Sequence, residues 1–306
     1  MRSLVGYTGF VGSNLYENGD FDFAYNSKNI EDSFGTNPDL LVYSGISAEM
    51  YLANNFPDKD FAQIENAIEN IKKINPKFLV LISTVSVYGE NCKGDENTVI
   101  NESKLTVYGK NRLYLEKWVE KSFDKYLIVR LPALYGKNLK KNFIYDYIHV
   151  IPKLLKYEKF EELSQKNEKL HDFYEKQDNG FYKCSNLTEE ENSNLVSFFK
   201  SVGFSALNFT DSRSKYQFYN LKKLWNHIQK AMNLGIHKLN ITTEPVSVSE
   251  LYEHMEGKSF KNELNKAPFD YDLRSVHAGI LGGKDGYLFD KNFVVEDIKR
   301  FVETEK

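Results

Sequence analysis

The chain has 306 residues, which is enough for one large domain or two ordinary ones with a sizeable core. Its 40 Lys and Arg residues against 43 Asp and Glu residues give a net charge of −3, so a polyanion-binding surface and a nucleic-acid partner are not expected. No run reaches the roughly 18 apolar residues of a membrane span, so we expect no membrane association.

The cysteines and histidines suggest neither a disulfide framework nor a metal site. Cys92 and Cys184 are far apart and form no CxxC pattern, and the amino terminus has no signal-peptide pattern, so a reduced cytoplasmic location is expected. The six histidines are scattered singly, and none has another His or Cys at zinc-ligand spacing. We therefore predict no metal.

Apolar stretches of strand length alternate with helical patterns in the first half of the chain. The strand candidates are "SLVGYTG" (3–9), "DLLVYSG" (39–45), "KFLVLISTVSVYG" (77–89) and "YLIVRLPALYG" (126–136). Between them, "DFAQIENAIENIKKI" has apolar residues at helical spacing, with Asp60 placed to cap its amino end. Near-continuous apolar strands in this order predict an α/β fold with a doubly wound parallel sheet.

The second half of the chain has a different amino-acid composition. Residues 151–200 are rich in Lys, Glu, Asn and Ser, and the spacing of Leu154, Leu155, Phe160 and Leu163 predicts packed helices. We therefore predict a first domain over residues 1–150 and a smaller, mostly helical region over 151–306. Within that region, 215–245 is expected to return to the first domain.

A glycine-rich turn follows the first strand. "GYTGFVGSNL" places Gly6, Gly9 and Gly12 between a strand and a helix, where glycines allow a tight turn against a dinucleotide pyrophosphate. The alternative is a purely structural turn. The predicted cofactor contacts at this turn are Gly6, Thr8, Gly9, Phe10, Val11 and Gly12.

Four motifs together resemble the extended short-chain dehydrogenase/reductase family, of the NAD-dependent epimerase/dehydratase type. They are "GYTGFVGSNL", "ISTVSVYG", "YGKNRLYLE" and "VRLPALYG", in the family's order and at about its spacing. The resemblance implies a Rossmann domain that binds NAD(P) and a smaller domain that holds a nucleotide-activated sugar. It also implies that a homodimer is a candidate assembly.

The resemblance assigns catalytic roles to three residues. Tyr108 matches the family's proton-transferring tyrosine, and Thr84 matches the hydroxyl that orients the substrate oxygen. Arg112 stands where the family has lysine; it shares a helical face with Tyr108, and a fixed cation there favours the phenolate and can bind the cofactor ribose. Because guanidinium and ammonium are not interchangeable, two hypotheses stand: a working site, or a dinucleotide-binding sensor or scaffold without turnover.

Positions at which this sequence differs from the family's motifs reduce the number of reactions that the resemblance implies. Val85 and Ser86 occupy the places of the Asp-Glu pair of the family's dehydratases, so no carboxylate is placed to eliminate water. Val85 also replaces the cysteine of the epimerase-reductases that make GDP-fucose. Reduction of a keto sugar, or 4-epimerisation by oxidation and re-reduction, remains.

The end of the second strand bears on the choice of cofactor. The tip of this strand is expected at Asn26, Ser27 and Lys28, where there is no carboxylate, and this favours NADP over NAD. If the strand ended a few residues later, Glu31 or Asp32 could bind the ribose of NAD. Ser44 and Gly45 end another strand and are expected near the cofactor, and Leu131 and Pro132 resemble the family segment beside the nicotinamide. The expected substrate contacts are Thr84, Val85, Asn142, Arg213 and Gln217.

Overall fold

The computed structural model describes residues 1–90, 93–178 and 180–305. Cys92 lies outside the described residues, and Cys184 is a free, partly buried thiol. Across the described ranges, no helix combines the length and apolar character that a membrane span needs.

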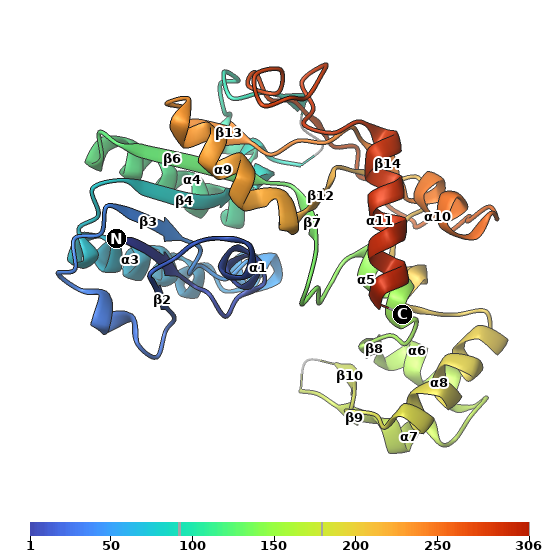
Figure 1. Ribbon diagram of the computed structural model, residues 1–306. Helices are drawn as coiled ribbons and strands as arrows, with labels where there is room; N and C mark the ends of the chain where they lie inside the picture. The colour runs from blue at the N-terminus through green and yellow to red at the C-terminus, as the bar shows by residue number, and fades with distance from the viewer. Residues whose placement is uncertain (91–92, 179, 306) are drawn as a thin grey trace.

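A six-stranded sheet forms the amino-terminal part of the molecule (Figure 1). Its strands, in spatial order, are β13 (Lys238–Asn240), β6 (Tyr126–Leu131), β4 (Leu79–Thr84), β3 (Leu40–Tyr43), β1 (Arg2–Val5) and β2 (Phe23–Tyr25). Every neighbouring pair is parallel. The predicted α/β fold with a doubly wound parallel sheet is confirmed.

Helices cover both faces of this sheet, which is why its strands are apolar on both sides. On one face, α3 (Pro57–Ile74) and α4 (Val107–Ser122) bury residues such as Ile64 and Leu115 against the sheet. On the other face, α1 (Phe10–Asn18) and α9 (Leu224–Asn233) bury Leu15 and Ile228. The sheet is therefore a rigid platform whose strand ends can hold a site.

The strand order reverses at β1, which lies between β2 and β3. Between β2 and β3 the chain forms a short 3₁₀ helix, η1 (Ile30–Ser33), and after β3 it forms α2 (Met50–Asn55). Open α/β sheets bind ligands outside the carboxyl ends of the strands at such a switch point. The ends of β1, β2 and β3 are therefore the place to look for a site.

The prediction that Asp60 caps its helix is wrong. Helix α3 begins one turn earlier, at Pro57 with Phe56 in the capping position, because proline suits the first turn of a helix. Asp60 therefore lies inside the helix, where it is buried.

Two predicted strands are shorter than the apolar stretches that suggested them. The 77–89 stretch leaves the sheet after Thr84 and forms the 3₁₀ helix η2 (Val85–Tyr88). The 126–136 stretch divides at Pro132: β6 ends there, and β7 (Ala133–Tyr135) pairs in parallel with β12 (Phe218–Asn220) outside the main sheet. Proline lacks the N–H that a continuous ladder needs.

The carboxyl-terminal part has two further cores. One joins α5 (Phe143–His149), α10 (Val248–Glu256) and the last helix, α11 (Lys291–Glu305). The other belongs to a small lobe made of α6 (Tyr157–Ser164), α7 (Leu170–Phe173), α8 (Glu189–Ser201), β8 (Leu154–Lys156), β9 (Tyr174–Lys176) and β10 (Phe181–Cys184).

The small lobe differs from its prediction in one respect. Leu154 and Leu155 lie in β8 of an antiparallel sheet of order β8-β10-β9, and the helix begins only at Tyr157. The remaining short elements are β5 (Lys93–Gly94), β11 (Lys215–Tyr216), β14 (Val246–Ser247), β15 (Asp272–Leu273), η3 (Glu102–Lys104), η4 (Ala206–Phe209) and η5 (Leu221–Lys223).

Candidate active site

The glycine turn after β1 has the geometry that its sequence requires. Gly6 has φ +91°, a conformation that favours glycine, and a Cβ on Gly12 would lie 2.0 Å from the Gly6 carbonyl oxygen. Helix α1 starts with Gly9 in the capping position and no side-chain cap, so its first-turn N–H groups face outward. Phe10 and Val11 pack against the core and can offer only their backbone to a ligand. This turn fits a pyrophosphate.

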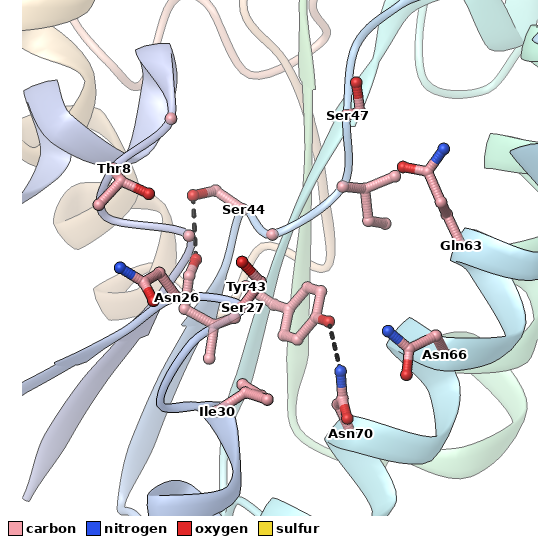
Figure 2. Close-up of a pocket in the computed structure, with 15 residues that line it drawn as sticks. Thr8, Asn26, Ser27, Ile30, Tyr43, Ser44, Ser47, Gln63, Asn66 and Asn70 are labelled. Carbon is pink, nitrogen blue, oxygen red and sulfur yellow. Dashed lines mark hydrogen bonds between the residues drawn. The ribbon is translucent and has the colours of Figure 1, made fainter. Parts of the chain in front are cut away.

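A pocket of about 410 Å³ opens at the ends of β1, β2 and β3, facing α3 (Figure 2). Its lining residues are Val5, Gly6, Thr8, Gly9, Asn26, Ser27, Ile30, Tyr43, Ser44, Gly45, Ile46, Ser47, Gln63, Asn66 and Asn70. The structure thus brings together seven of the predicted cofactor contacts: Gly6, Thr8, Gly9, Asn26, Ser27, Ser44 and Gly45.

The polar groups of this pocket are hydroxyls and amides. Among its lining residues there is no carboxylate, and β2 ends at Tyr25, so exposed Glu31 and Asp32 lie beyond the strand tip in η1. Lys28 is exposed beside the tip and donates its backbone N–H to Asn26 Oδ1 at 2.8 Å. The pocket therefore lacks the acid that usually binds a ribose 2′-hydroxyl.

Three amide side chains on α3 were missed by the sequence analysis. Gln63, Asn66 and Asn70 point from α3 toward the pocket (Figure 2), and Asn70 donates to the Tyr43 hydroxyl at 3.5 Å. Their spacing of three and four residues on a predicted amphipathic helix was the available signal.

Tyr108 and Thr84 meet at the amino end of α4. Thr106 caps this helix, and a Cβ on Gly109 would lie 2.5 Å from the Ser86 carbonyl oxygen, so α4 packs closely on η2. Tyr108 is 5% exposed. Burial raises the pKa of its phenol above the ordinary value, although nearby Arg112 and a hydrogen bond with Thr84 act to lower it.

Arg112 lies against Tyr108 but is paired with a carboxylate. The centre of its guanidinium lies 4.5 Å from the centre of the Tyr108 ring. Its Nη1 and Nη2 each donate to Asp60 at 3.0 Å, and Nη2 also donates to the Ser47 carbonyl at 2.7 Å. Arg112 is 4% exposed and Asp60 1%.

This pairing corrects two expectations. The sequence analysis expected Arg112 to favour the phenolate, but burial raises the pKa of the Tyr108 phenol above its ordinary value, and Asp60 opposes the effect of Arg112 as well. Because both terminal nitrogens are occupied and buried, Arg112 is not placed to hold a cofactor ribose.

The remaining cofactor contacts lie at neighbouring strand ends. Leu131, the last residue of β6, is the register partner of Thr84 in β4, and Pro132 follows it. Ser44 follows β3 and donates its hydroxyl to the Val5 carbonyl at 3.1 Å. Ser44 thus lines the pocket at the end of β3, whereas Leu131 and Pro132 lie beside Thr84 at the end of β6, on the other side of β4.

Four of the predicted substrate contacts interact with other residues of the protein. Val85 packs in a small core with Leu105 and Leu113. Asn142 caps α5: its Oδ1 accepts from the N–H groups of Ile144 and Tyr145.

Gln217 and Arg213 are also engaged. Gln217 is 3% exposed; its amide donates to the carbonyls of Thr243 and Leu273 and accepts from the Leu273 N–H. Arg213 pairs with Asp211 through Nε at 3.0 Å and Nη2 at 2.7 Å. The side chains of Val85, Asn142 and Gln217 are engaged within the fold, which corrects their prediction as substrate contacts, whereas exposed Arg213 stays a predicted contact.

The described residues hold no group of three or more His, Cys, Asp or Glu side chains arranged to bind a metal ion.

The chain was compared with known proteins. The model of the NAD dependent epimerase/dehydratase family matches residues 25–170, just under half of the chain. No curated protein matches significantly.

Solved structures of similar fold cover the whole chain. A dTDP-4-dehydrorhamnose reductase from Yersinia enterocolitica is 13% identical, with a TM-score of 0.63 over 100% of this chain and 99% of that one. The Bacillus anthracis dTDP-4-dehydrorhamnose reductase in complex with NADP is 15% identical, with a TM-score of 0.60 over 99% and 97%. The Thermotoga maritima UDP-glucose 4-epimerase with UDP-glucose is 17% identical, with a TM-score of 0.57 over 99% and 98%.

At these identities the solved structures show the fold alone. The family match rests on the segment that carries the pocket wall, Thr84, Tyr108 and Arg112, and it agrees with the motifs in the sequence. Residues 25–170 are thus similar to the NAD dependent epimerase/dehydratase family.

Proposed function

We propose that the protein is an NADP(H)-dependent reductase of a keto group on a nucleotide-activated sugar. The single observation that carries this proposal is the state of Tyr108: a buried phenol beside Thr84, next to a cation that is already compensated by Asp60. At neutral pH such a tyrosine holds its proton and is ready to donate it.

The glycine turn and the pocket fit a nicotinamide dinucleotide. The turn offers backbone N–H groups to the pyrophosphate, and the amide-lined pocket takes the adenosine end, with Asn26, Ser27 and exposed Lys28 near its ribose. Without a carboxylate in the lining, a 2′-phosphate meets no repulsion there. We therefore favour NADP over NAD.

The chemistry follows from the positions of the hydroxyls. A reduced nicotinamide, when bound, would supply the hydride for the carbonyl carbon. Thr84 orients the carbonyl oxygen by a hydrogen bond, and Tyr108 donates its phenolic proton to that oxygen, so that an alcohol forms and the phenolate remains. Arg112, whose guanidinium lies over the ring, stabilises that phenolate.

The protonated phenol favours reduction over 4-epimerisation. An epimerase must first oxidise an alcohol, which requires Tyr108 to accept a proton, and burial disfavours the phenolate that would do so. A reductase uses the form that the site stabilises.

The second candidate is a dinucleotide-binding sensor or scaffold without turnover. The pairing of Arg112 with Asp60 favours it, because the cation expected to activate the tyrosine is compensated. This candidate shares the pocket and differs in the role of Tyr108.

The first test is cofactor binding. Denaturing the purified protein and identifying released nucleotide, then titrating the empty protein with NADPH and NADH, should give tighter binding of NADPH. Tightly retained NAD⁺ would instead favour an epimerase, and binding of neither nucleotide would contradict the proposal.

The second test is turnover. With NADPH and a panel of keto sugar nucleotides, Tyr108→Phe should lower turnover by about 100-fold or more while NADPH affinity hardly changes. Tyr114→Phe, an exposed tyrosine on the same helix, is the control. Turnover in neither wild type nor variant, with NADPH bound, would favour the sensor.

Two further parts of the proposal are a cytoplasmic location and a homodimer. Cell fractionation tests the location, and sedimentation velocity of the purified protein tests the homodimer.

A further inference from the structure

We propose that Asp60 is a positioning residue: through Arg112 it keeps Tyr108 a proton donor and holds the wall of the dinucleotide pocket in place. This inference rests on the proposed function of Tyr108 and extends it to a residue on a different helix.

Asp60 is built to hold Arg112 in one orientation. It lies in α3, fully enclosed, and its two carboxylate oxygens accept from the two terminal nitrogens of Arg112. Asn111 Nδ2 donates to the same carboxylate at 2.8 Å. A planar guanidinium bound by both nitrogens cannot rotate, so the pair fixes how α4 faces α3.

The guanidinium of Arg112, held in this orientation, contacts both Tyr108 and the wall of the pocket. Its flat side lies 4.5 Å from the Tyr108 ring centre, and Nη2 donates to the carbonyl of Ser47, which lines the pocket. The next carbonyl, Ala48, accepts from Lys141 Nζ at 2.8 Å. The loop after β3 is thus held by cations from two directions, and Asp60 positions one of them.

Burial raises the pKa of Tyr108 most, and the two charges beside it, Arg112 and Asp60, act on the same proton in opposite directions. Arg112 on α4 favours the phenolate, and Asp60 on α3 opposes it. Two further groups of the described residues that contact Tyr108 are neutral: the Thr84 hydroxyl at the end of β4, and the Asn54 Oδ1 of α2, which accepts the Tyr108 N–H at 3.4 Å. Removing the Asp60 charge therefore leaves an uncompensated cation beside the phenol.

The test follows the ionisation of Tyr108 in the free protein. Tyrosine labelled with ¹³C at Cζ gives one resonance per tyrosine, and Tyr108→Phe identifies the one that belongs to Tyr108. In Asp60→Asn, which keeps the shape and removes the charge, the pKa of Tyr108 should fall by about 1–3 units. An unchanged Tyr108 titration would overturn the proposal.

Two comparisons separate a charge effect from general damage. In Asp60→Asn/Arg112→Gln both charges are gone, so the pKa of Tyr108 should return toward the wild-type value. Should Asp60→Asn not fold, this double variant is compared with Arg112→Gln, in which the Asp60 charge remains and Tyr108 should titrate at higher pH. Equal titrations in those two variants would also overturn the proposal.

The pocket wall gives a second readout. Asp60→Asn should weaken NADPH binding about tenfold, because the Ser47 contact loosens, whereas exposed Asp58→Asn on the same helix should not. Equal affinity in wild type and Asp60→Asn would contradict the role at the wall. If wild type binds no NADPH, the proposed function fails, but the ligand-free titration still decides whether Asp60 controls Tyr108.

Discussion

The ion pair between Glu116 and Arg130 gives the sharpest stability prediction. Glu116 on α4 is 0% exposed and Arg130 on β6 is 2% exposed. Arg130 donates to Glu116 through Nε at 3.1 Å and 3.2 Å and through Nη2 at 2.7 Å. Ser83, the residue before Thr84 in β4, donates to the same carboxylate at 2.5 Å.

Glu116→Gln keeps the shape of the side chain but leaves the Arg130 charge buried without its counter-ion. Removing one partner of a buried pair costs about 3–5 kcal/mol of unfolding free energy. For a chain of 306 residues, with an unfolding entropy of about 2.1 cal/mol/K per residue, that corresponds to a fall in Tm of about 5–8 °C. Arg130 cannot shed its proton to escape the penalty, because arginine stays charged in proteins.

Thermal unfolding followed by circular dichroism measures the effect. Partly exposed Glu120, which pairs with Lys238 at 2.7 Å, provides the control on the same helix: Glu120→Gln should cost less than about 1 kcal/mol. In Glu116→Leu/Arg130→Met both charges are absent, so the loss should be smaller than in Glu116→Gln. The reasoning is refuted if Glu116→Gln melts within about 2 °C of wild type, or if the double variant is the less stable of the two.

Three further predictions concern the pocket and the pH dependence of stability. Gly12→Ala places a Cβ 2.0 Å from the Gly6 carbonyl oxygen, so calorimetry should show NADPH affinity at least about tenfold weaker; wild-type affinity would contradict the clash. Asn26→Asp adds a carboxylate at the β2 tip and should shift the ratio of the two Kd values toward NADH; an unchanged ratio would place the ribose elsewhere. Burial lowers the pKa of His227 from 6.5 to about 4, so its neutral form stabilises the fold above pH 6.5. About 3 kcal/mol of that contribution should be lost as the pH falls from 6.5 to 4, and the urea midpoint of His227→Gln should depend less on pH over that range; an equal dependence would exclude His227 as its source.

Local patterns in the sequence predicted the sheet and the position of the main site. Apolar strands and glycines act through neighbouring residues, so the turn at Gly6 could be recognised without the fold. The meeting of Thr84 and Tyr108 was also expected, but from the family resemblance rather than from the spacing of the residues. The structure places both at the amino end of α4.

The failures have one physical cause. Asp60 was taken as a helix cap because carboxylates favour that place, but its partner Arg112 lies 52 positions later in the chain. Gln217 was expected at the substrate, yet it bonds Leu273, 56 positions away. A polar side chain close to a motif is interpreted by proximity, whereas its burial and its partner depend on the tertiary fold.

The same consideration explains why arginine can stand where the family resemblance implies lysine. A lysine offers a compact ammonium, whereas Arg112 presents a planar fork that binds both oxygens of Asp60 and still donates to Ser47. The arginine at position 112 is therefore explained by the buried carboxylate of Asp60 on α3. Taken alone it suggested a fixed cation that favours the phenolate, but burial raises the pKa of the Tyr108 phenol more than Arg112 lowers it, and Asp60 opposes Arg112 as well, so the phenol keeps its proton.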